Sequence, residues 1–382
     1  MDALQTAQGA WQIGLADSLQ GRARYGAALR VTSALRVAAL ADADIRAAKF
    51  QAREIGGSPA VFADFESLLT AALPLDAFLL TVPMAQRSAH LIALAQAGLP
   101  ALTEVPFGLT LEQTDAALLA AQSANVLLAP AFPRRFDPLF DAATAQLLDG
   151  AIGEVKQARC EWTLPIGETE RGDTVGGYDW NILLQQVACQ SADICRLWFG
   201  AALSVSADIE FLSQPSDLPQ SRRRNPRVSD TVAVILVAHE RGSVTHQITR
   251  TRATFPGERY LLTGANGTLE LLARGGTQLA TSAAPTLTRQ MPGQRPERLL
   301  TGQTFAAANI LHTAAMLAHF AECLGGKTSP LVTAADARAA QEIVHAAYLS
   351  SFENIKVSLP LRRSVSIESM LRRDDEPPAL SE

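Results

Sequence analysis

The chain has 382 residues, of which 48% are hydrophobic and 19% are charged, and its formal net charge at pH 7 is −5. This length exceeds what one hydrophobic core usually organises, so the composition predicts two folded domains of ordinary size and excludes wholesale disorder. The small negative charge lacks the basic footprint of proteins that bind nucleic acid or acidic membrane surfaces. We therefore expect a small-molecule partner, no nucleic acid and no membrane.

The four cysteines, Cys160, Cys189, Cys195 and Cys323, form no C-x-x-C pair and no close Cys/His group along the chain. Such spacing is typical of reduced, packed thiols, so the sequence predicts no metal site. The first residues do not combine a basic start with an apolar segment, and no uninterrupted apolar stretch is long enough to span a membrane. We therefore expect a soluble, cytoplasmic protein.

In the first third of the chain, short apolar runs alternate with longer segments of helical periodicity. The predicted strands are residues 11–16, 35–40, 60–62, 76–82, 100–104 and 125–131. The predicted helices are residues 45–55, 64–72, 86–97, 111–123 and 137–148. This alternation is typical of β-α units on a parallel sheet. It predicts an α/β fold that begins with a doubly wound, Rossmann-like parallel sheet, whose ligand crevice lies at the carboxyl ends of the strands.

Beyond Gly150 the pattern changes to longer strand-like runs, with one helix between them at residues 180–198. The strands are predicted at residues 154–162, 204–212, 230–238, 243–252, 259–264 and 267–272. We expect a second, α+β domain with an open, mostly antiparallel sheet, and domain bounds of 1–132 and 133–365 before a tail at 366–382. Because open sheet faces and edges commonly make subunit contacts, we also expect a homo-oligomer.

An ordered series of sequence strings resembles the glucose-fructose oxidoreductase, inositol dehydrogenase and MocA family (Gfo/Idh/MocA). The strings include "VAALADAD", "AFPRRFDPLF", "LLDGAIGEVKQARCEW", "DICRLWFG" and "LLTGANGTLEL", and the series covers roughly residues 11–362. The resemblance implies that the first domain binds NAD or NADP. It also implies oxidation or reduction of a sugar, a polyol or a related molecule at the domain junction.

The phosphate-binding loop departs from the family's G-x-G-x-x-G string. Gly14 and Gly21 can stand for its first and last glycines, but Ala16 replaces the middle one, the spacing is longer, and Asp17 adds negative charge. This segment therefore either binds the pyrophosphate weakly or no longer cradles it.

Three further segments of the first domain correspond to cofactor-site strings of the family. Asp42 ends the second predicted strand, where an acid would bind a ribose 2′-hydroxyl and favour NAD, or would merely cap the next helix. In "TVPMAQR", Thr81 and Pro83 match the family's Thr-Pro-Asn string. Met84 and Arg87 stand at its Asn and His positions. His90, one turn on, could face the crevice but is expected to pack.

The segment "TEVPF" matches the family's Glu-Lys-Pro string, whose lysine helps to move the hydroxyl proton. Glu104 and Pro106 are retained, whereas Val105 cannot titrate. In the second domain, Gln186 and Gln190 align with the family's Asp-x-x-x-His pair, and Asp193 is the titratable group left on that helix stripe. Loss of general acid-base help typically costs about 10²- to 10⁴-fold in rate.

Other polar candidates are Arg135, Trp162 and Tyr178. Arg135 could clamp a substrate carboxylate or form an ion pair, Trp162 could contact substrate, and Tyr178 could donate a proton or simply pack. Two functions lead on this evidence, and a lyase or hydrolase without net redox chemistry stays open although no residue selects it. The chain is either an NAD(P)-dependent oxidoreductase with a rearranged active site, or a non-catalytic relative that acts as a ligand sensor or as a partner subunit of an active paralogue.

Overall fold

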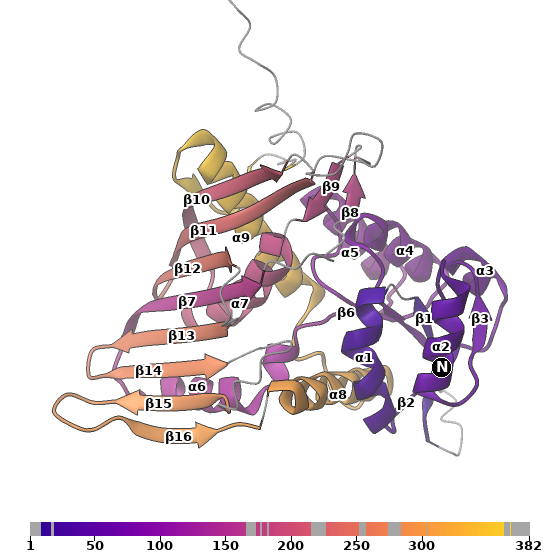
Figure 1. The fold of residues 1–382 in the computed structure, drawn as a ribbon, viewed down its shortest axis with the longest axis horizontal. Helices are drawn as coiled ribbons and strands as arrows, with labels where there is room; N and C mark the ends of the chain where they lie inside the picture. The colour runs from indigo at the N-terminus through magenta and orange to yellow at the C-terminus, as the bar shows by residue number, and fades with distance from the viewer. Residues whose placement is uncertain are drawn as a thin grey trace, which may run out of the picture. The chain divides into compact units, whose positions relative to one another are not determined.

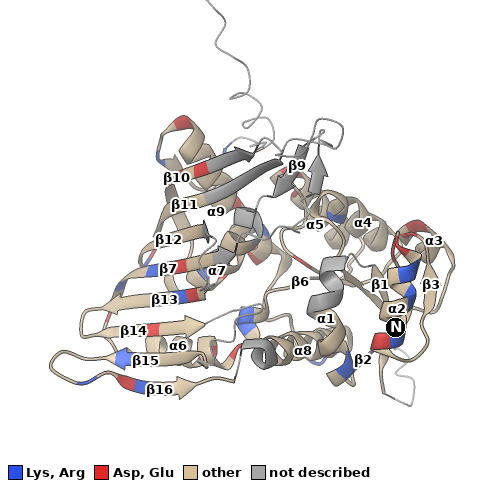
Figure 2. Ribbon diagram, viewed as in Figure 1, with Lys and Arg blue, Asp and Glu red and all other residues tan. Residues whose placement is uncertain are grey.

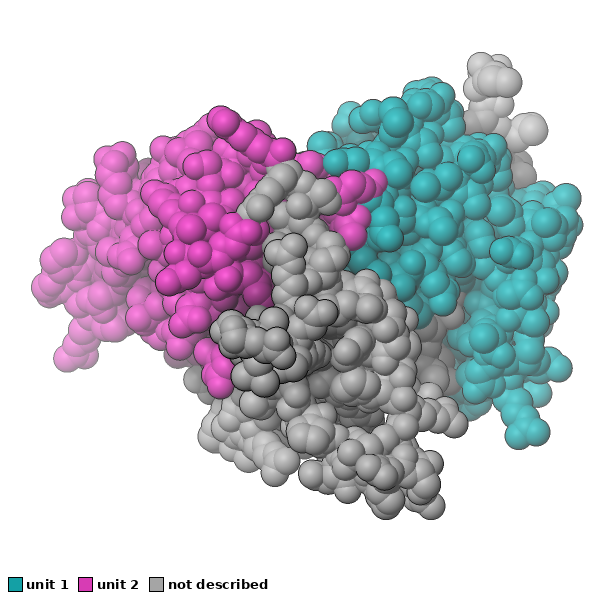
Figure 3. Space-filling model, turned by 90° about the horizontal axis from the view of Figure 1, so that it is seen from above, with its two compact units in different colours: residues 1–109, 113–141, 302–337 teal, residues 110–112, 142–301, 338–382 magenta. Residues whose placement is uncertain are grey.

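The computed structural model describes residues 9–16, 19–165, 173–175, 178–181, 183–214, 227–251, 257–273, 284–303, 305–362 and 367. The chain divides into two compact units, coloured separately in Figure 3. The first comprises residues 1–109, 113–141 and 302–337, and the second comprises residues 110–112, 142–301 and 338–382. The first unit thus includes residues 302–337, which the sequence analysis placed in the second domain.

The first unit is built on a six-stranded sheet with the order β3-β2-β1-β4-β5-β6. All neighbouring strands of this sheet run parallel, as the alternation of strands and helices predicted. The strands are β1 (Trp11–Ala16), β2 (Leu35–Ala41), β3 (Ala60–Phe62), β4 (Ala77–Leu80), β5 (Ala101–Thr103) and β6 (Leu128–Pro130). The doubly wound sheet is therefore confirmed.

The helices of this region are α1 (Leu19–Val31), α2 (Ile45–Ile55), α3 (Phe65–Thr70), α4 (Met84–Gln96) and α5 (Leu111–Ser123) (Figure 1). Helix α4 begins at Met84, directly after Pro83, and not at Gln86 as the sequence predicted. Strand β6 starts at Leu128 and not at Asn125. Asn125 adopts a left-handed φ of 52°, and the backbone N–H of Val126 donates to the carbonyl of Ala121 at the end of α5.

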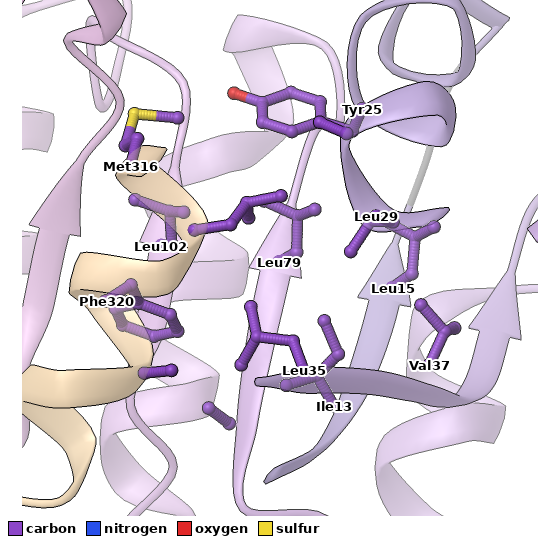
Figure 4. Packing of buried hydrophobic residues seen from close by; sticks show 14 of the residues in the cluster. Ile13, Leu15, Tyr25, Leu29, Leu35, Val37, Leu79, Leu102, Met316 and Phe320 are labelled. Atoms are coloured by element: carbon purple, nitrogen blue, oxygen red, sulfur yellow. The ribbon is translucent and has the colours of Figure 1, made fainter. Parts of the chain in front are cut away.

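The core of the first unit joins distant parts of the chain. Side chains from β1, β2, β4 and α1 pack together with Met316, Leu317 and Phe320 of helix α8 (Phe305–Leu324) (Figure 4). Tyr25, Leu79 and Leu102 belong to the same cluster. Because α8 buries apolar side chains against this sheet, residues far along the chain complete the core of the first unit.

The second unit contains an 11-stranded sheet, in which most neighbours are antiparallel. Its main path is β16-β15-β14-β13-β7-β12-β11-β10-β17, and β7 and β12 form a parallel pair. The strands on this path are β7 (Val155–Pro165), β10 (Ala202–Gln214), β11 (Arg227–His239), β12 (Gly242–Thr251), β13 (Gly257–Gly264), β14 (Thr268–Ala273), β15 (Thr286–Gln290), β16 (Glu297–Thr301) and β17 (Val357–Ser358). The open, mostly antiparallel sheet is confirmed.

One short strand replaces the start of the predicted helix at residues 180–198. Trp180 belongs to β9 (Tyr178–Asn181), which pairs with β8 (Asp173–Val175) and with β11. The helix that follows is α7 (Leu183–Phe199), so the predicted start at Trp180 is wrong. The remaining helical elements are η1 (Pro133–Phe136), α6 (Pro138–Leu148) and α9 (Ala334–Glu353).

Alternate residues of the large sheet are buried and exposed, as one solvated face requires. Acidic and basic residues mix on the neighbouring strands β7, β13 and β14 (Figure 2). The Arg259 guanidinium lies 2.6 Å from Glu270 and 3.2 Å from Glu161. On β10 and β11, Leu203, Val234 and Leu236 are exposed and apolar. In the described part of the chain, no helix is long and apolar enough to span a membrane.

Candidate functional site

The strand order of the first unit places the crevice between β1 and β4. The chain leaves β1 toward β2 on one side and then crosses to β4 on the other, and ligands of doubly wound sheets bind at this reversal. The carboxyl ends of β1, β2, β4 and β5 are followed or formed by Ala16, Asp42, Thr81 and Glu104. Four predicted cofactor-site residues therefore lie at one edge of the sheet.

Gly14 lies inside β1, two residues before its end. A Cβ atom at this position would come within 2.5 Å of the Phe78 ring, so glycine is needed here for packing against β4. Ala16 is the last residue of β1, and Gly21 falls in the first turn of α1, whose start carries no acidic residue. The start of α1, which is the positive end of its dipole, follows the end of β1, and a phosphate can be bound at such a helix start. Asp17 and the side chains around Gly21 lie outside the described part.

Asp42 and Asp44 have different roles at the end of β2. The carboxylate of Asp44 accepts hydrogen bonds from the backbone N–H groups of Arg46 and Ala47, which makes Asp44 the N-cap of α2. Asp42 accepts a hydrogen bond, at 2.8 Å, from the backbone N–H of Asp44. The helix cap that the sequence offered as an alternative for Asp42 is thus provided by Asp44.

Thr81 and Arg87 hold the loops after β4 in place. The Thr81 hydroxyl and backbone N–H both donate to the carbonyl of Ala16, at 3.2 and 2.8 Å. The buried Arg87 guanidinium donates to the carbonyl of Val82 at 2.9 Å and to that of Pro106 at 3.0 Å. Arg87 therefore ties the loop after β4 to the loop after β5.

Two neighbouring side chains of α4 are packed. Met84 is buried, and the His90 ring lies 4.2 Å from the Phe65 ring while its Nδ1 is 2.8 Å from the carbonyl oxygen of Gln86. Burial lowers the pKa of His90 below its ordinary value, although the Gln86 carbonyl and Glu66 oppose the change. The expectation that His90 packs is confirmed.

The loop after β5 contains Glu104, Val105 and Pro106. Glu104 and Val105 are buried, and the Val105–Pro106 peptide bond is cis. Val105 is 2% exposed, so this position presents a packed aliphatic side chain and no titratable group. The loop is held at Pro106 by Arg87, as described above.

The predicted residues of the second unit lie on α7 and β7. Asp193 is fully buried and Gln190 is half-buried on α7, whereas the side chains of Gln186 and Tyr178 are outside the described part. Trp162 lies on β7, where its buried indole N–H has no hydrogen-bond partner among the described residues.

Arg134 and Arg135 lie in η1 of the first unit. Arg134 lies 3.7 Å from Asp137 and its guanidinium is 5.8 Å from the centre of the Phe140 ring. Arg135 is half-buried in the same short helix. The structure therefore gives Arg134 a structural ion pair. The carboxylate clamp at Arg135 stays a prediction.

The sequence did not predict the contacts of two groups. It placed Arg87 at the family's histidine position but did not indicate that its guanidinium links two loops. It also left Cys160, Cys195 and His246 apart, although their ligand atoms all lie within 4.8 Å of one another. No spacing along the chain signals either arrangement, because strand pairing and helix packing create both.

Family models match both parts of the chain. Residues 13–132 match the model "Oxidoreductase family, NAD-binding Rossmann fold", and residues 145–359 match "Oxidoreductase family, C-terminal alpha/beta domain". The chain belongs to the Gfo/Idh/MocA oxidoreductase family. The resemblance on which the expected fold rested is thereby confirmed, and the N-terminal domain is of an NAD-binding type.

Two curated relatives are sugar dehydrogenases. D-apiose dehydrogenase of Paraburkholderia graminis is 27% identical over 279 residues, which cover 69% of this chain and 68% of the relative. D-xylose 1-dehydrogenase (NADP(+)) 2 of Haloferax volcanii is 30% identical over 168 residues, or 43% of this chain and 49% of the relative.

Solved structures share the fold at low identity. An Agrobacterium radiobacter oxidoreductase in complex with NAD+, L-tartaric acid and magnesium has a TM-score of 0.73 and 19% identity, covering 94% of this chain and 99% of that one. A myo-inositol dehydrogenase from Corynebacterium glutamicum has a TM-score of 0.69 and 17% identity, covering 92% of this chain and 99% of that one.

The residues at the sheet edge fit a dinucleotide in part. The parallel sheet, the helix start after β1 and the acid at Asp42 are the features that such a ligand uses. The central glycine of the phosphate loop is replaced by Ala16, and Gly14 is occupied in packing against Phe78. The predicted ribose contact at Asp42 is therefore retained, whereas the predicted phosphate loop departs from the family's string.

Proposed function

We propose that this chain is an NAD(P)-dependent oxidoreductase that acts on a sugar, a polyol or a related small molecule through a rearranged catalytic group. The observation that carries the proposal is the acid at the end of β2 beside the strand-order reversal, in a chain whose two domains both belong to the family. The sugar dehydrogenases among its relatives support the substrate class.

Asp42 favours NAD over NADP in this proposal. A carboxylate there accepts hydrogen bonds from the ribose hydroxyls and repels a 2′-phosphate. The cap of α2 is Asp44 and not Asp42. Thr81 and Arg87 keep the loops around the nicotinamide end in place through their contacts with Ala16, Val82 and Pro106.

The bound nicotinamide would exchange a hydride with a substrate carbon. Proton transfer then depends on the chain's own residues, and Val105 cannot hold or donate a proton. Gln186 and Gln190 can hydrogen-bond a hydroxyl or carbonyl, Asp193 and Tyr178 are the titratable candidates, and Arg135 and Trp162 are the proposed substrate contacts. We therefore expect slow turnover.

Cofactor binding can be tested by calorimetry with NAD+, NADH, NADP+ and NADPH. Asp42→Ala is expected to weaken NAD binding and to reduce the preference over NADP. Asp44→Ala removes the α2 cap and should leave that preference unchanged. Absence of binding at millimolar cofactor concentrations would exclude the proposed oxidoreductase.

A second candidate is a non-catalytic relative that retains the fold as a ligand sensor or as the partner of an active paralogue. Two observations favour it. Val105, at the position of the family's lysine, is a buried aliphatic side chain. Arg87, at the histidine position that follows the Thr-Pro-Asn string, donates its guanidinium hydrogen bonds to loop carbonyls.

Assays with D-apiose, D-xylose and myo-inositol in the presence of each cofactor separate the two candidates. Turnover by the wild type excludes the non-catalytic function. Binding without turnover, together with activity gained by the combined Val105→Lys, Gln186→Asp and Gln190→His variant, supports it.

A further inference from the structure

The second unit contains a buried group of two thiols and one imidazole that comes from three different elements. Cys160 lies on β7, His246 lies opposite it on β12, and Cys195 lies on α7, which packs across β12. The two Sγ atoms are 3.4 Å apart, and the ligand atoms of all three residues lie within 4.8 Å of one another. Cys160 and Cys195 are fully buried, and His246 is 2% exposed.

His246 offers a ring nitrogen to this group. Its Nδ1 lies 2.9 Å from the Ser191 hydroxyl, whereas its buried Nε2 has no hydrogen-bond partner among the described residues. A buried polar atom without a partner costs free energy, and binding to an ion removes that cost. An imidazole nitrogen with a free lone pair is a common zinc ligand.

A buried carboxylate near the thiols favours a bound cation. Glu258 lies on β13, which pairs with β7, and its negative charge acts on Cys160. Glu258 is itself buried, and its carboxylate accepts a hydrogen bond from the Tyr260 hydroxyl at 2.8 Å. Two thiolates and a divalent ion would have no net charge, which is the arrangement that a buried site tolerates best.

We propose that Cys160, Cys195 and His246 bind one Zn²⁺ ion in the second unit. Zinc uses thiolate and imidazole ligands, with Zn–S bonds of about 2.3 Å that place two sulfurs about 3.7 Å apart in a tetrahedral site. The observed separation of 3.4 Å is close to that value, and a nitrogen of the imidazole lies within 4.8 Å of both sulfurs. The three residues supply three of the four ligands of a tetrahedral site.

The zinc ion would join β7, β12 and α7 from the inside. Because the group is buried, the ion enters as the unit folds, and its binding free energy then stabilises the folded state. This role is independent of the proposed oxidoreductase activity, since all three ligands belong to the second unit and none is a proposed catalytic or cofactor-binding residue.

The full chain can be tested directly for metal. Protein expressed with added zinc and purified under reducing conditions should contain one zinc per chain by elemental analysis. Cobalt substituted for zinc should show thiolate-to-cobalt charge-transfer absorption. Cys160→Ser, Cys195→Ser and His246→Gln should each lose the stoichiometric metal. The matched control Cys189→Ser alters a buried thiol of the same helix outside the group and should retain it.

Thermal unfolding supplies a second readout. Zinc should raise the Tm of the chelator-treated wild type and of Cys189→Ser, but not that of the three ligand variants. A reduced wild type without stoichiometric zinc and without the cobalt-thiolate band overturns the proposal, even if a ligand variant fails to fold. Metal retained by all three ligand variants overturns it as well. So does an intact mass that shows a Cys160–Cys195 disulfide in place of bound metal.

Discussion

At position 14, glycine is required because a ring of the neighbouring strand occupies the space of its side chain. The Cβ of an alanine there would lie 2.5 Å from Cε1 of Phe78. We expect Gly14→Ala to lower the free energy of unfolding by about 1–3 kcal/mol through overpacking. Urea unfolding measures this change, and adding Phe78→Leu should restore part of the stability.

Gly26 provides the matched control for that substitution. It lies in α1, and a Cβ there would meet nothing within 4 Å. Gly26→Ala should therefore stabilise the protein by about 0.5–1 kcal/mol, because alanine has the higher helix propensity. Equal effects at the two positions would contradict the packing role of Gly14.

Arg87 is the residue whose role changes most between sequence and structure. Its buried guanidinium donates to the carbonyls of Val82 and Pro106. Arg87→Met keeps the length of the side chain but leaves both carbonyls without this donor, and we expect a loss of about 2–3 kcal/mol in urea unfolding. Arg36→Met, at an exposed arginine, should change stability by less than about 0.5 kcal/mol. A similar loss of stability in both variants would argue against the stabilising role of the Arg87 hydrogen bonds.

At the scale of the element, α2 depends on the residue that precedes it. The Asp44 carboxylate accepts from the backbone N–H groups of Arg46 and Ala47. Asp44→Ala should cost about 1 kcal/mol, measured by denaturant unfolding, while Asp44→Ser should retain most of the cap. If serine and alanine destabilise equally, the carboxylate does not act as a cap.

At the scale of the whole molecule, buried histidines make folding sensitive to acid. The pKa of His246 falls from an ordinary value near 6.5 to about 3, chiefly because of burial and then because of His239. The unfolded chain binds the additional proton, so this contribution is fully present above about pH 6.5 and is lost as the pH falls toward 3.

This linkage predicts that stability falls by up to about 1.4 kcal/mol per pH unit in that window. In the presence of a metal chelator, His246→Gln should reduce the slope with which the free energy of urea unfolding depends on pH. Gln247→Ala, at an exposed neutral residue of the same strand, should leave it as steep as in the wild type. An unchanged slope in His246→Gln would show that other groups account for the acid sensitivity.

The open face of the large sheet leads us to propose a homo-oligomer. Leu203, Val234 and Leu236 are 50%, 44% and 46% exposed on neighbouring strands. Leu236→Lys should weaken self-association in sedimentation experiments without unfolding the second unit. Leu119→Lys, at an exposed leucine of α5, is the control and should leave association unchanged. A monomeric wild type would contradict the proposal.

The sequence was sufficient to predict the elements whose signals are local. Apolar runs and helix periods located the six parallel strands, and Ile45–Ile55 and Leu111–Ser123 were predicted with their observed ends. The helix predicted from Trp180 was wrong because Trp180 pairs as a strand with β11, and no local pattern reports that pairing. Strands β15 and β16 went unpredicted for the same reason.

The sequence by itself determined the family plan and the residue types at its site positions, because those depend on order along the chain. Tertiary structure alone decided what these residues touch: Gly14 faces Phe78, Arg87 binds two loop carbonyls, and Asp44 rather than Asp42 caps α2. It also brought Cys160 and Cys195, 35 residues apart, to within 3.4 Å. Strand register and helix packing fix such distances, and both result from burial of the whole core rather than from any local pattern.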